Sequence, residues 1–99
     1  MLHIVNRSHA QTSSLQSCLR LAQPGSAVLL IEDAVYAATA AAAQASGIAD
    51  ALAKHKVYVL QPDAAARGLG ARLTEGVTTI DYAGFVDLVA EHTNNQTWL

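Results

Sequence analysis

The sequence predicts a three-layer, flavodoxin-like α/β domain that spans residues 1–99 and contains a mostly parallel sheet. Apolar segments of strand length alternate with segments of helical periodicity along the whole chain, a pattern typical of βαβ units with right-handed crossovers. The most apolar run, 27–31, contains no polar residue, as expected of a central strand covered on both faces. We therefore expect four to five strands with helices on both sides.

The first half of the chain contains two strand–helix pairs. Residues 2–5 predict a short strand, and a polar segment rich in helix-capping residues follows it. The next helix begins near Thr12 and ends at the Pro24–Gly25 pair. Its apolar residues recur on one stripe: Leu15, Cys18, Leu19 and Ala22. After the strand 27–31, we expect a helix capped by Asp33 that continues through the alanine-rich segment to about Ser46.

The second half continues the alternation. A short helical piece at 48–55 precedes a third strand at 56–60, which is rich in β-favouring residues. Pro62 and Asp63 open a helix that runs to about Arg67. A fourth strand follows at 77–80, and residues 96–99 are expected to add a short edge strand. The last helix is predicted at 82–92, with these residues facing inward: Phe85, Leu88 and Val89.

Composition excludes several classes of protein. Only 14% of the residues are charged, which is well below the roughly 25% of an average domain and suggests that part of the surface lies in an oligomer interface. A net charge of -2 without a basic cluster argues against direct binding of nucleic acid. No apolar run approaches the length of a membrane span, and we find no secretory leader. These features favour the cytoplasm.

Cys18 is the only cysteine and thus the only residue that could carry sulfur as a persulfide. It shares an apolar stripe with two leucines, and free cysteine is among the most buried residue types, so packing is the alternative interpretation. The four histidines show no spacing typical of metal ligands. The segment 6–14 offers hydroxyl and amide groups but contains neither glycine nor a phosphate-binding motif. We therefore expect no metal and no cofactor.

Ligands and partners of parallel α/β sheets usually meet the loops beyond the carboxyl ends of the strands. In this chain those loops are 6–9, 32–36 and 61–70. Trp98 is expected to insert into a groove of its own subunit or of a neighbouring one, because a terminal tryptophan that docks nowhere would gain nothing. The candidate interface residues are Tyr36, Trp98 and Leu99.

Several sequence blocks, in matching order, resemble the DsrH/TusB family, which comprises the smallest subunits of the DsrEFH and TusBCD sulfur-relay complexes. The resemblance spans the whole chain and is closer to the DsrH side, because Cys18 matches a helical cysteine of DsrH proteins from sulfur oxidisers. The blocks are MLHIVNRS at the start, LQSCL at 15–19, VLLIEDAVYA at 28–37, YVLQPDAAARG at 58–68, DYAGFVDL at 81–88 and QTWL at 96–99.

The resemblance implies a heterohexamer that contains two copies each of this chain, a DsrE/TusD-like subunit and a DsrF/TusC-like subunit. In that family the persulfide-carrying cysteine belongs to the DsrE/TusD partner, in the loop after its third strand. Here that region reads Leu60, Gln61 and Pro62 and contains no thiol. The chain is therefore expected to be a structural and docking subunit of a cytoplasmic complex that passes sulfur to a DsrC/TusE-type acceptor, for sulfur oxidation or for 2-thiouridine synthesis in tRNA.

Two further hypotheses stay open at this point. Cys18 could act as an auxiliary sulfur acceptor in the complex, or the chain could be an independent thiol carrier that uses Cys18. Without its partners the chain could also form a homo-oligomer, because its surface is short of charge.

Overall fold

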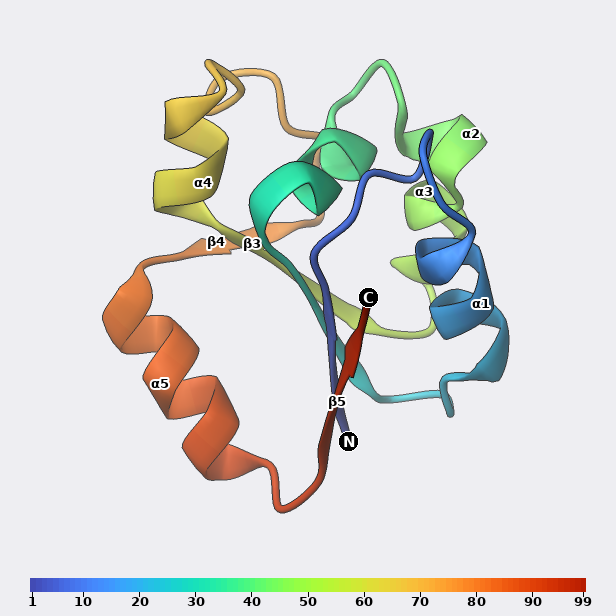
Figure 1. Ribbon diagram of the computed structural model, residues 1–99, viewed down its shortest axis with the longest axis vertical. Helices are drawn as coiled ribbons and strands as arrows, with labels where there is room; N and C mark the ends of the chain where they lie inside the picture. Colours follow the sequence, from blue (N-terminus) through green and yellow to red (C-terminus); the bar gives the residue numbers. More distant parts are fainter.

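The computed structural model describes residues 1–99 and contains one five-stranded sheet in which every neighbouring pair is parallel (Figure 1). The strand order is β4-β3-β2-β1-β5. The strands are β1 (Leu2–Val5), β2 (Ala27–Leu30), β3 (Lys56–Leu60), β4 (Thr78–Ile80) and β5 (Asn95–Trp98). The predicted parallel α/β architecture is confirmed, including the edge strand at the end of the chain.

The strand order determines which face each helix covers. From β1 to β4 the chain always moves to the next strand in one direction, so right-handed crossovers place all the connecting helices on one face. These are α1 (Ser14–Leu21), the 3-10 helix η1 (Glu32–Ala38), α2 (Ala43–Ser46), α3 (Ile48–Ala51) and α4 (Gln61–Ala66). The helix α5 (Tyr82–Glu91) carries the chain back across the sheet to β5 and covers the opposite face alone. Figure 1 shows α5 on one side of the strands and α1, α2 and α3 on the other.

Two apolar clusters fill the spaces between the three layers. The larger one contains sixteen buried residues and lies between the sheet and the helices α1 to α4. The smaller one contains five buried residues beneath α5. Alternate residues of β1, β2 and β3 supply the two clusters; Val28 and Leu30 of β2 face the larger one, and Ala27 and Leu29 face the smaller one. The central strand β2 is therefore buried on both faces, as its continuous apolar run predicts.

The predicted helix from Asp33 to Ser46 is wrong in its middle. After η1 the backbone at Thr39 pairs as an antiparallel bridge with Leu73, and Ala40 N–H donates to the Arg72 carbonyl. These hydrogen bonds replace those of a helix, so a tertiary contact outweighs the high helix propensity of alanine in this segment. Asp33 is not the N-cap either. Ile31 occupies the N-cap position of η1, and no side chain accepts a capping hydrogen bond there.

Two details of the helices also depend on tertiary packing. Val89 was expected to face inward, but its side chain is 37% exposed, because only Leu88 and Phe85 of α5 reach the smaller cluster. Gly47, predicted to end a helix, separates α2 from α3 in the left-handed conformation (φ 89°), and a Cβ there would lie 3.3 Å from Leu19 of α1. None of the helices has the length and apolarity needed to cross a bilayer.

The start of α5 generates a test of the fold. Asp81 Oδ1 accepts a hydrogen bond from Gly84 N at 2.8 Å and so caps the helix. We expect Asp81→Ala to lower the free energy of unfolding by about 1 kcal/mol, because one N–H at the helix start loses its partner. Asp81→Asn, which keeps the accepting oxygen, and Asp87→Ala, which removes an exposed carboxylate from the same helix, are the controls. Chemical denaturation measures the difference, and equal losses in all three variants would contradict the capping role.

Candidate docking site at the carboxyl edge of the sheet

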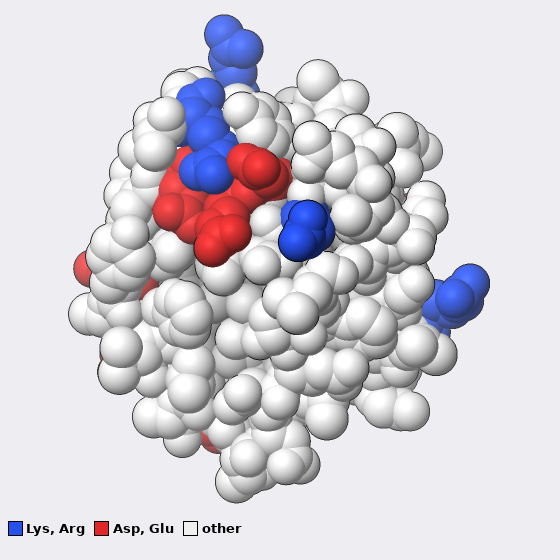
Figure 2. Space-filling model, viewed as in Figure 1, with Lys and Arg blue, Asp and Glu red and all other residues white.

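Charged side chains gather at the carboxyl ends of β2 and β3. Figure 2 shows acidic atoms over η1 and the start of α4, with basic atoms beside them. The acidic groups are Glu32 and Asp33 of η1 and Asp63 of α4, and the basic group is Arg67, directly after α4. The loops 32–36 and 61–70, predicted to be functional, therefore lie against each other.

A strained residue lies at the centre of this contact. Glu32 directly follows the β2–η1 junction and has φ 50°, which makes it the only residue other than glycine with a positive φ. The Asp63 carboxylate accepts a hydrogen bond from Glu32 N at 2.6 Å, and this charge-assisted bond offsets part of the cost of the left-handed backbone. Strain of this kind is typical of positions whose exact geometry matters to function.

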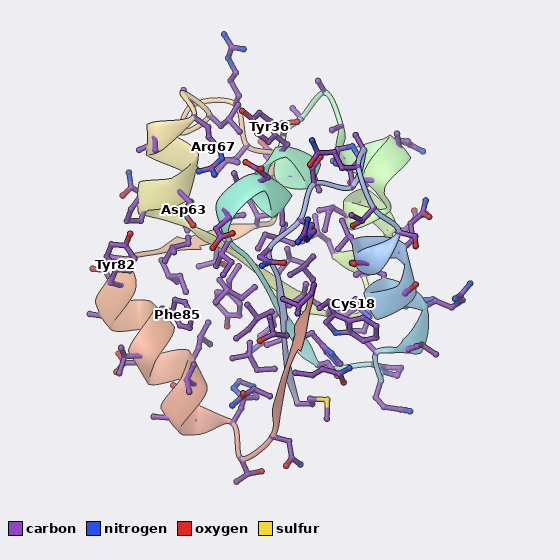
Figure 3. The ribbon with its side chains drawn as sticks, in the orientation of Figure 1. Cys18, Tyr36, Asp63, Arg67, Tyr82 and Phe85 are labelled. Carbon is purple, nitrogen blue, oxygen red and sulfur yellow. The ribbon has the colours of Figure 1, made fainter.

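An ion pair joins the same two elements. Arg67 Nη2 lies 3.0 Å from Asp33 Oδ1, and Arg67 Nε donates to the same oxygen at 3.0 Å. Arg67 also donates to the Asp63 carbonyl at 3.1 Å. Figure 3 shows Asp63 and Arg67 where α4 meets η1, with Tyr36 nearby. The Asp33 side chain is 53% exposed, so the pair orients the two elements more than it stabilises the fold.

Tyr36 lies at the rim of a shallow groove of about 470 Å³ between η1 and the loop that follows α4. The groove is lined by Tyr36, Thr39, Ala40, Ala41, Leu69 and Arg72. Tyr36 is 40% exposed, whereas Leu69 at the base is only 6% exposed. An apolar base with one tyrosine and one arginine at the rim is the composition that protein interfaces favour.

The first loop contributes two polar atoms without internal partners. Asn6 Oδ1 and His9 Nδ1 are buried and accept or donate no hydrogen bond within the protein. Leaving such atoms unpaired costs about 1–3 kcal/mol each. They follow β1 at the same edge of the sheet as the loops after β2 and β3.

Cys18 lies at a distance from this edge. It is completely buried in the larger cluster, between α1 and the sheet, and Figure 3 shows it far from Tyr36 and Arg67. Burial raises the pKa of the Cys18 thiol to about 12. At neutral pH the group is therefore a protonated thiol without access to solvent, which is a poor nucleophile. Nothing cationic is placed to offset that burial, since desolvation is the only cause of the shift.

The other two interface candidates differ in their surroundings. Trp98 inserts into its own subunit, where it packs on the larger cluster and its indole N–H donates to His3 Nδ1 at 3.1 Å. Leu99 is 74% exposed, and its carbonyl accepts a hydrogen bond from the Ser14 hydroxyl at the start of α1. Among the three candidates, Tyr36 and Leu99 are exposed, whereas Trp98 is half-buried and lines a pocket beside His3.

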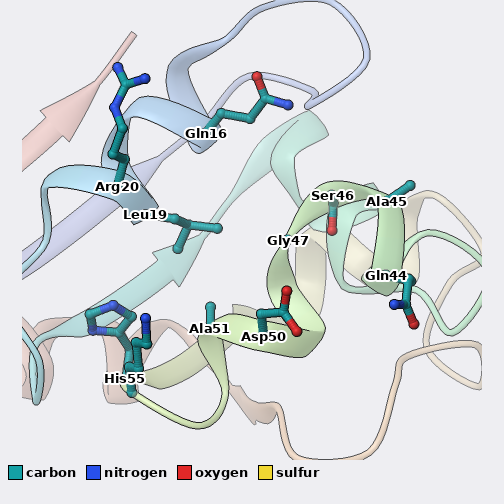
Figure 4. A pocket seen from close by; sticks show the side chains of 11 residues that line it. Gln16, Leu19, Arg20, Gln44, Ala45, Ser46, Gly47, Asp50, Ala51 and His55 are labelled. Carbon is teal, nitrogen blue, oxygen red and sulfur yellow. The ribbon is translucent and has the colours of Figure 1, made fainter.

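A second groove lies between α1 and the pair α2–α3 and has a volume of about 310 Å³. Arg20, Asp50 and His55 are among the residues that line it. Figure 4 shows the Arg20 guanidinium pointing away from Asp50 and His55, so the charged groups do not converge on one point. No group of three or more histidine, cysteine or acidic side chains could hold a metal ion.

The sequence places the loops 32–36 and 61–70 at one edge of the sheet but does not reveal all the contacts made within them. Asp63 was expected only to open a helix, yet its carboxylate also fixes the backbone of Glu32. An acidic residue directly after a proline at a helix start predicts a carboxylate near the N–H groups of its own helix, and this pattern does not point to Glu32. His3 gave no signal either, because strand alternation alone does not identify its partner Trp98.

Comparison with known proteins supplies the family. The model of the family described as "DsrH like protein" matches residues 7–95. The TusB protein of Escherichia coli O81 (strain ED1a) is 36% identical over 98 residues, which cover 99% of this chain and 100% of that protein. The TusB protein of Escherichia fergusonii is 36% identical over the same extent.

Solved structures support the same fold. MTH1491 of Methanobacterium thermoautotrophicum, a protein of unknown function, superposes with a TM-score of 0.74 at 16% identity over 97% of this chain and 95% of that chain. Tm0979 of Thermotoga maritima superposes with a TM-score of 0.60 at 22% identity over 93% of this chain and 94% of that chain. The expected family and fold are both confirmed, and the chain belongs to the DsrH/TusB family of sulfur-relay proteins.

Proposed function

We propose that this chain is a docking subunit, without its own sulfur chemistry, of a cytoplasmic sulfurtransferase complex. In this proposal residues 1–99 act as one domain that binds DsrE/TusD-like and DsrF/TusC-like subunits. The DsrE/TusD-like partner carries the persulfide and passes its outer sulfur to a DsrC/TusE-type acceptor. The observation that supports this assignment best is the state of the only thiol, which is completely buried and has a pKa of about 12.

The chemistry of sulfur relay explains why this observation supports the proposal. A thiolate must attack the outer sulfur of a donor persulfide, so that a new S–S bond forms while the donor's S–S bond breaks and the donor leaves as a thiolate. Both sulfurs and the leaving group need space in line with the attack. Cys18 offers neither a thiolate nor a path through α1. After β3 ends at Leu60, α4 begins directly at Gln61, and this region contains no thiol.

The Tyr36 groove is the surface best suited to hold a partner subunit. Its base is apolar and buried, and Arg72 at its rim is exposed and forms no ion pair within the chain. A partner segment with an apolar side chain next to a carboxylate would fill the groove and pair with Arg72. The contacts of Asp63 and Arg67 hold η1, and with it Tyr36, in a fixed position against α4.

The assembly itself is the first test. Mixed with its DsrE-like and DsrF-like partners, this chain is expected to co-elute with them as one species in size exclusion. The complex would then be incubated with a sulfane-sulfur donor, and the mass of each intact subunit measured. We expect an increase by one sulfur atom on the DsrE-like subunit and none on this chain. Separate elution would overturn the docking role, and added sulfur on this chain would make Cys18 an auxiliary acceptor.

The groove can be tested with a pair of matched tyrosines. Tyr36→Ala is expected to weaken assembly roughly 30-fold, since truncating a central interface tyrosine typically costs about 2 kcal/mol. Tyr82→Ala is the control, because Tyr82 is 61% exposed on the outer side of α5, away from the groove. Calorimetric titration of each variant with the partner subunits gives the dissociation constants. Equal weakening by both changes, or none by Tyr36→Ala, would place the docking surface elsewhere.

The competing hypothesis of an independent thiol carrier makes the opposite prediction about Cys18. Because the pKa of Cys18 is about 12 instead of its ordinary value of 9.0, we expect native Cys18 to react with a maleimide at least about a thousandfold more slowly than in the unfolded chain. The control is Ser13→Cys in a Cys18→Ala background, which places a thiol at an exposed position just before α1. Rapid labelling of the native protein at Cys18 would revive the carrier hypothesis.

A further inference from the structure

Trp98 of the last strand and His3 of β1 form a part-buried contact between aromatic side chains. β5 is an edge strand that pairs only with β1. Trp98 lies opposite Val5 in the register, and its indole N–H donates to Nδ1 of His3 at 3.1 Å. The two ring centroids are 6.1 Å apart and the ring planes are tilted by 43°. His3 is only 4% exposed, whereas Trp98 is half-buried, and both rings line a surface pocket.

This bond depends on the protonation state of His3. An imidazole nitrogen can accept a hydrogen bond only while it carries no proton. The indole N–H of Trp98 can only donate a hydrogen bond. Nδ1 of His3 must therefore carry no proton, and the proton of the neutral ring must lie on Nε2. A second proton on the ring would place N–H against N–H and replace an attraction with a repulsion.

We propose that the His3–Trp98 contact is a proton-operated latch, which holds β5 on the sheet at neutral pH and releases it on acidification. Opening places Trp98 and His3 in water, where the imidazole takes up a proton at Nδ1. It also uncovers the hydrogen-bonding edge of β1 and the part of the larger cluster on which Trp98 packs. The chain end is also held by a hydrogen bond from the Ser14 hydroxyl to the main-chain oxygen of Leu99.

The surroundings of His3 favour the neutral form. Burial lowers the pKa of the imidazole below its ordinary value of 6.5, and the positive charges of the Met1 α-amino group and of His55 lower it further. A pocket of about 400 Å³ beside the ring is otherwise lined by side chains that do not titrate: Leu21, Gln23, Ser26, Gln96 and Trp98. No carboxylate lines it, so no group there would stabilise a protonated ring in the closed state.

The direction of the pH effect follows from the two states. The closed state has the lowered pKa and the open, solvated state has the ordinary one, so opening takes up a proton. The latch is fully effective above pH 6.5 and weakens as the pH falls from 6.5 toward the lowered pKa of the closed state. Within that window the ratio of open to closed molecules is expected to rise about tenfold per unit of pH.

Two signals test the latch in the intact protein. Trp98 is the only tryptophan, so its emission reports on β5 alone; we expect a shift to longer wavelength with a midpoint below pH 6.5. Hydrogen exchange separates release from simple quenching by a charged imidazole. The protection of the β5 amides, corrected for the intrinsic pH dependence of exchange, should fall up to about tenfold per pH unit. Amides shared by β2 and β3 should keep their protection over the same range.

Variants identify the titrating group. In His3→Asn the side-chain oxygen can accept from the indole without titrating, so the pH dependence of emission and of β5 protection should disappear. Trp98→Phe removes the donor, so β5 protection should be low already at neutral pH and change little with pH. His55→Gln removes one of the two charges that act on His3, and the midpoint should move up toward 6.5. An unchanged transition in His3→Asn, or β5 protection in the original protein that does not respond to pH, would overturn the latch.

Discussion

The parallel ladder from β1 to β4 is the constraint on which the rest of the molecule depends. Each of the strands β2, β3 and β4 is added to the sheet on the same side of the strand before it. Right-handed connections therefore place α1 to α4 on a single face. The remaining face must then be covered by the one connection that returns across the sheet, α5. The same ladder brings all the carboxyl ends to one edge, so the loops after β2 and β3 meet there, where Asp63 and Arg67 contact η1.

The packing that this ladder requires also determines what Cys18 can do. A helix that covers a parallel sheet must place a continuous apolar stripe on it, and Cys18 lies in the middle of that stripe between Leu15 and Leu19. Complete burial makes the thiol part of the core and removes its acidity. While α1 packs in this way, Cys18 lacks both the solvent access and the acidity that sulfur transfer requires. In the proposed function such a subunit contributes surface to the relay, and another chain contributes the reactive sulfur.

The sequence predicted those parts of the fold that depend on local pattern. Each strand lies close to its predicted position, because continuous or β-favouring apolar runs are bounded by turn residues. The alanine-rich segment was mispredicted because the bonds of Ala38, Thr39 and Ala40 with the segment 72–74 are tertiary, and helix propensity carries no information on them. For the site, loop positions could be predicted from the sheet, and Tyr36 was correctly placed at that edge. The hydrogen bond between Glu32 N and the Asp63 carboxylate joins residues that are 31 positions apart, and no local sequence pattern reveals it.

The two edges of the sheet explain why β5 matters beyond the fold. An exposed strand edge invites pairing with another chain, and β4 limits this with only three residues. At the other edge β5 covers β1, whose residues Leu2 to Val5 are all buried and would otherwise present an apolar strand with free backbone groups. β5 itself has mostly exposed side chains, and Trp98 is its one anchor into the core. Besides the backbone pairing of β5 with β1, protection of this edge thus depends on a single indole and on the imidazole that accepts its hydrogen bond.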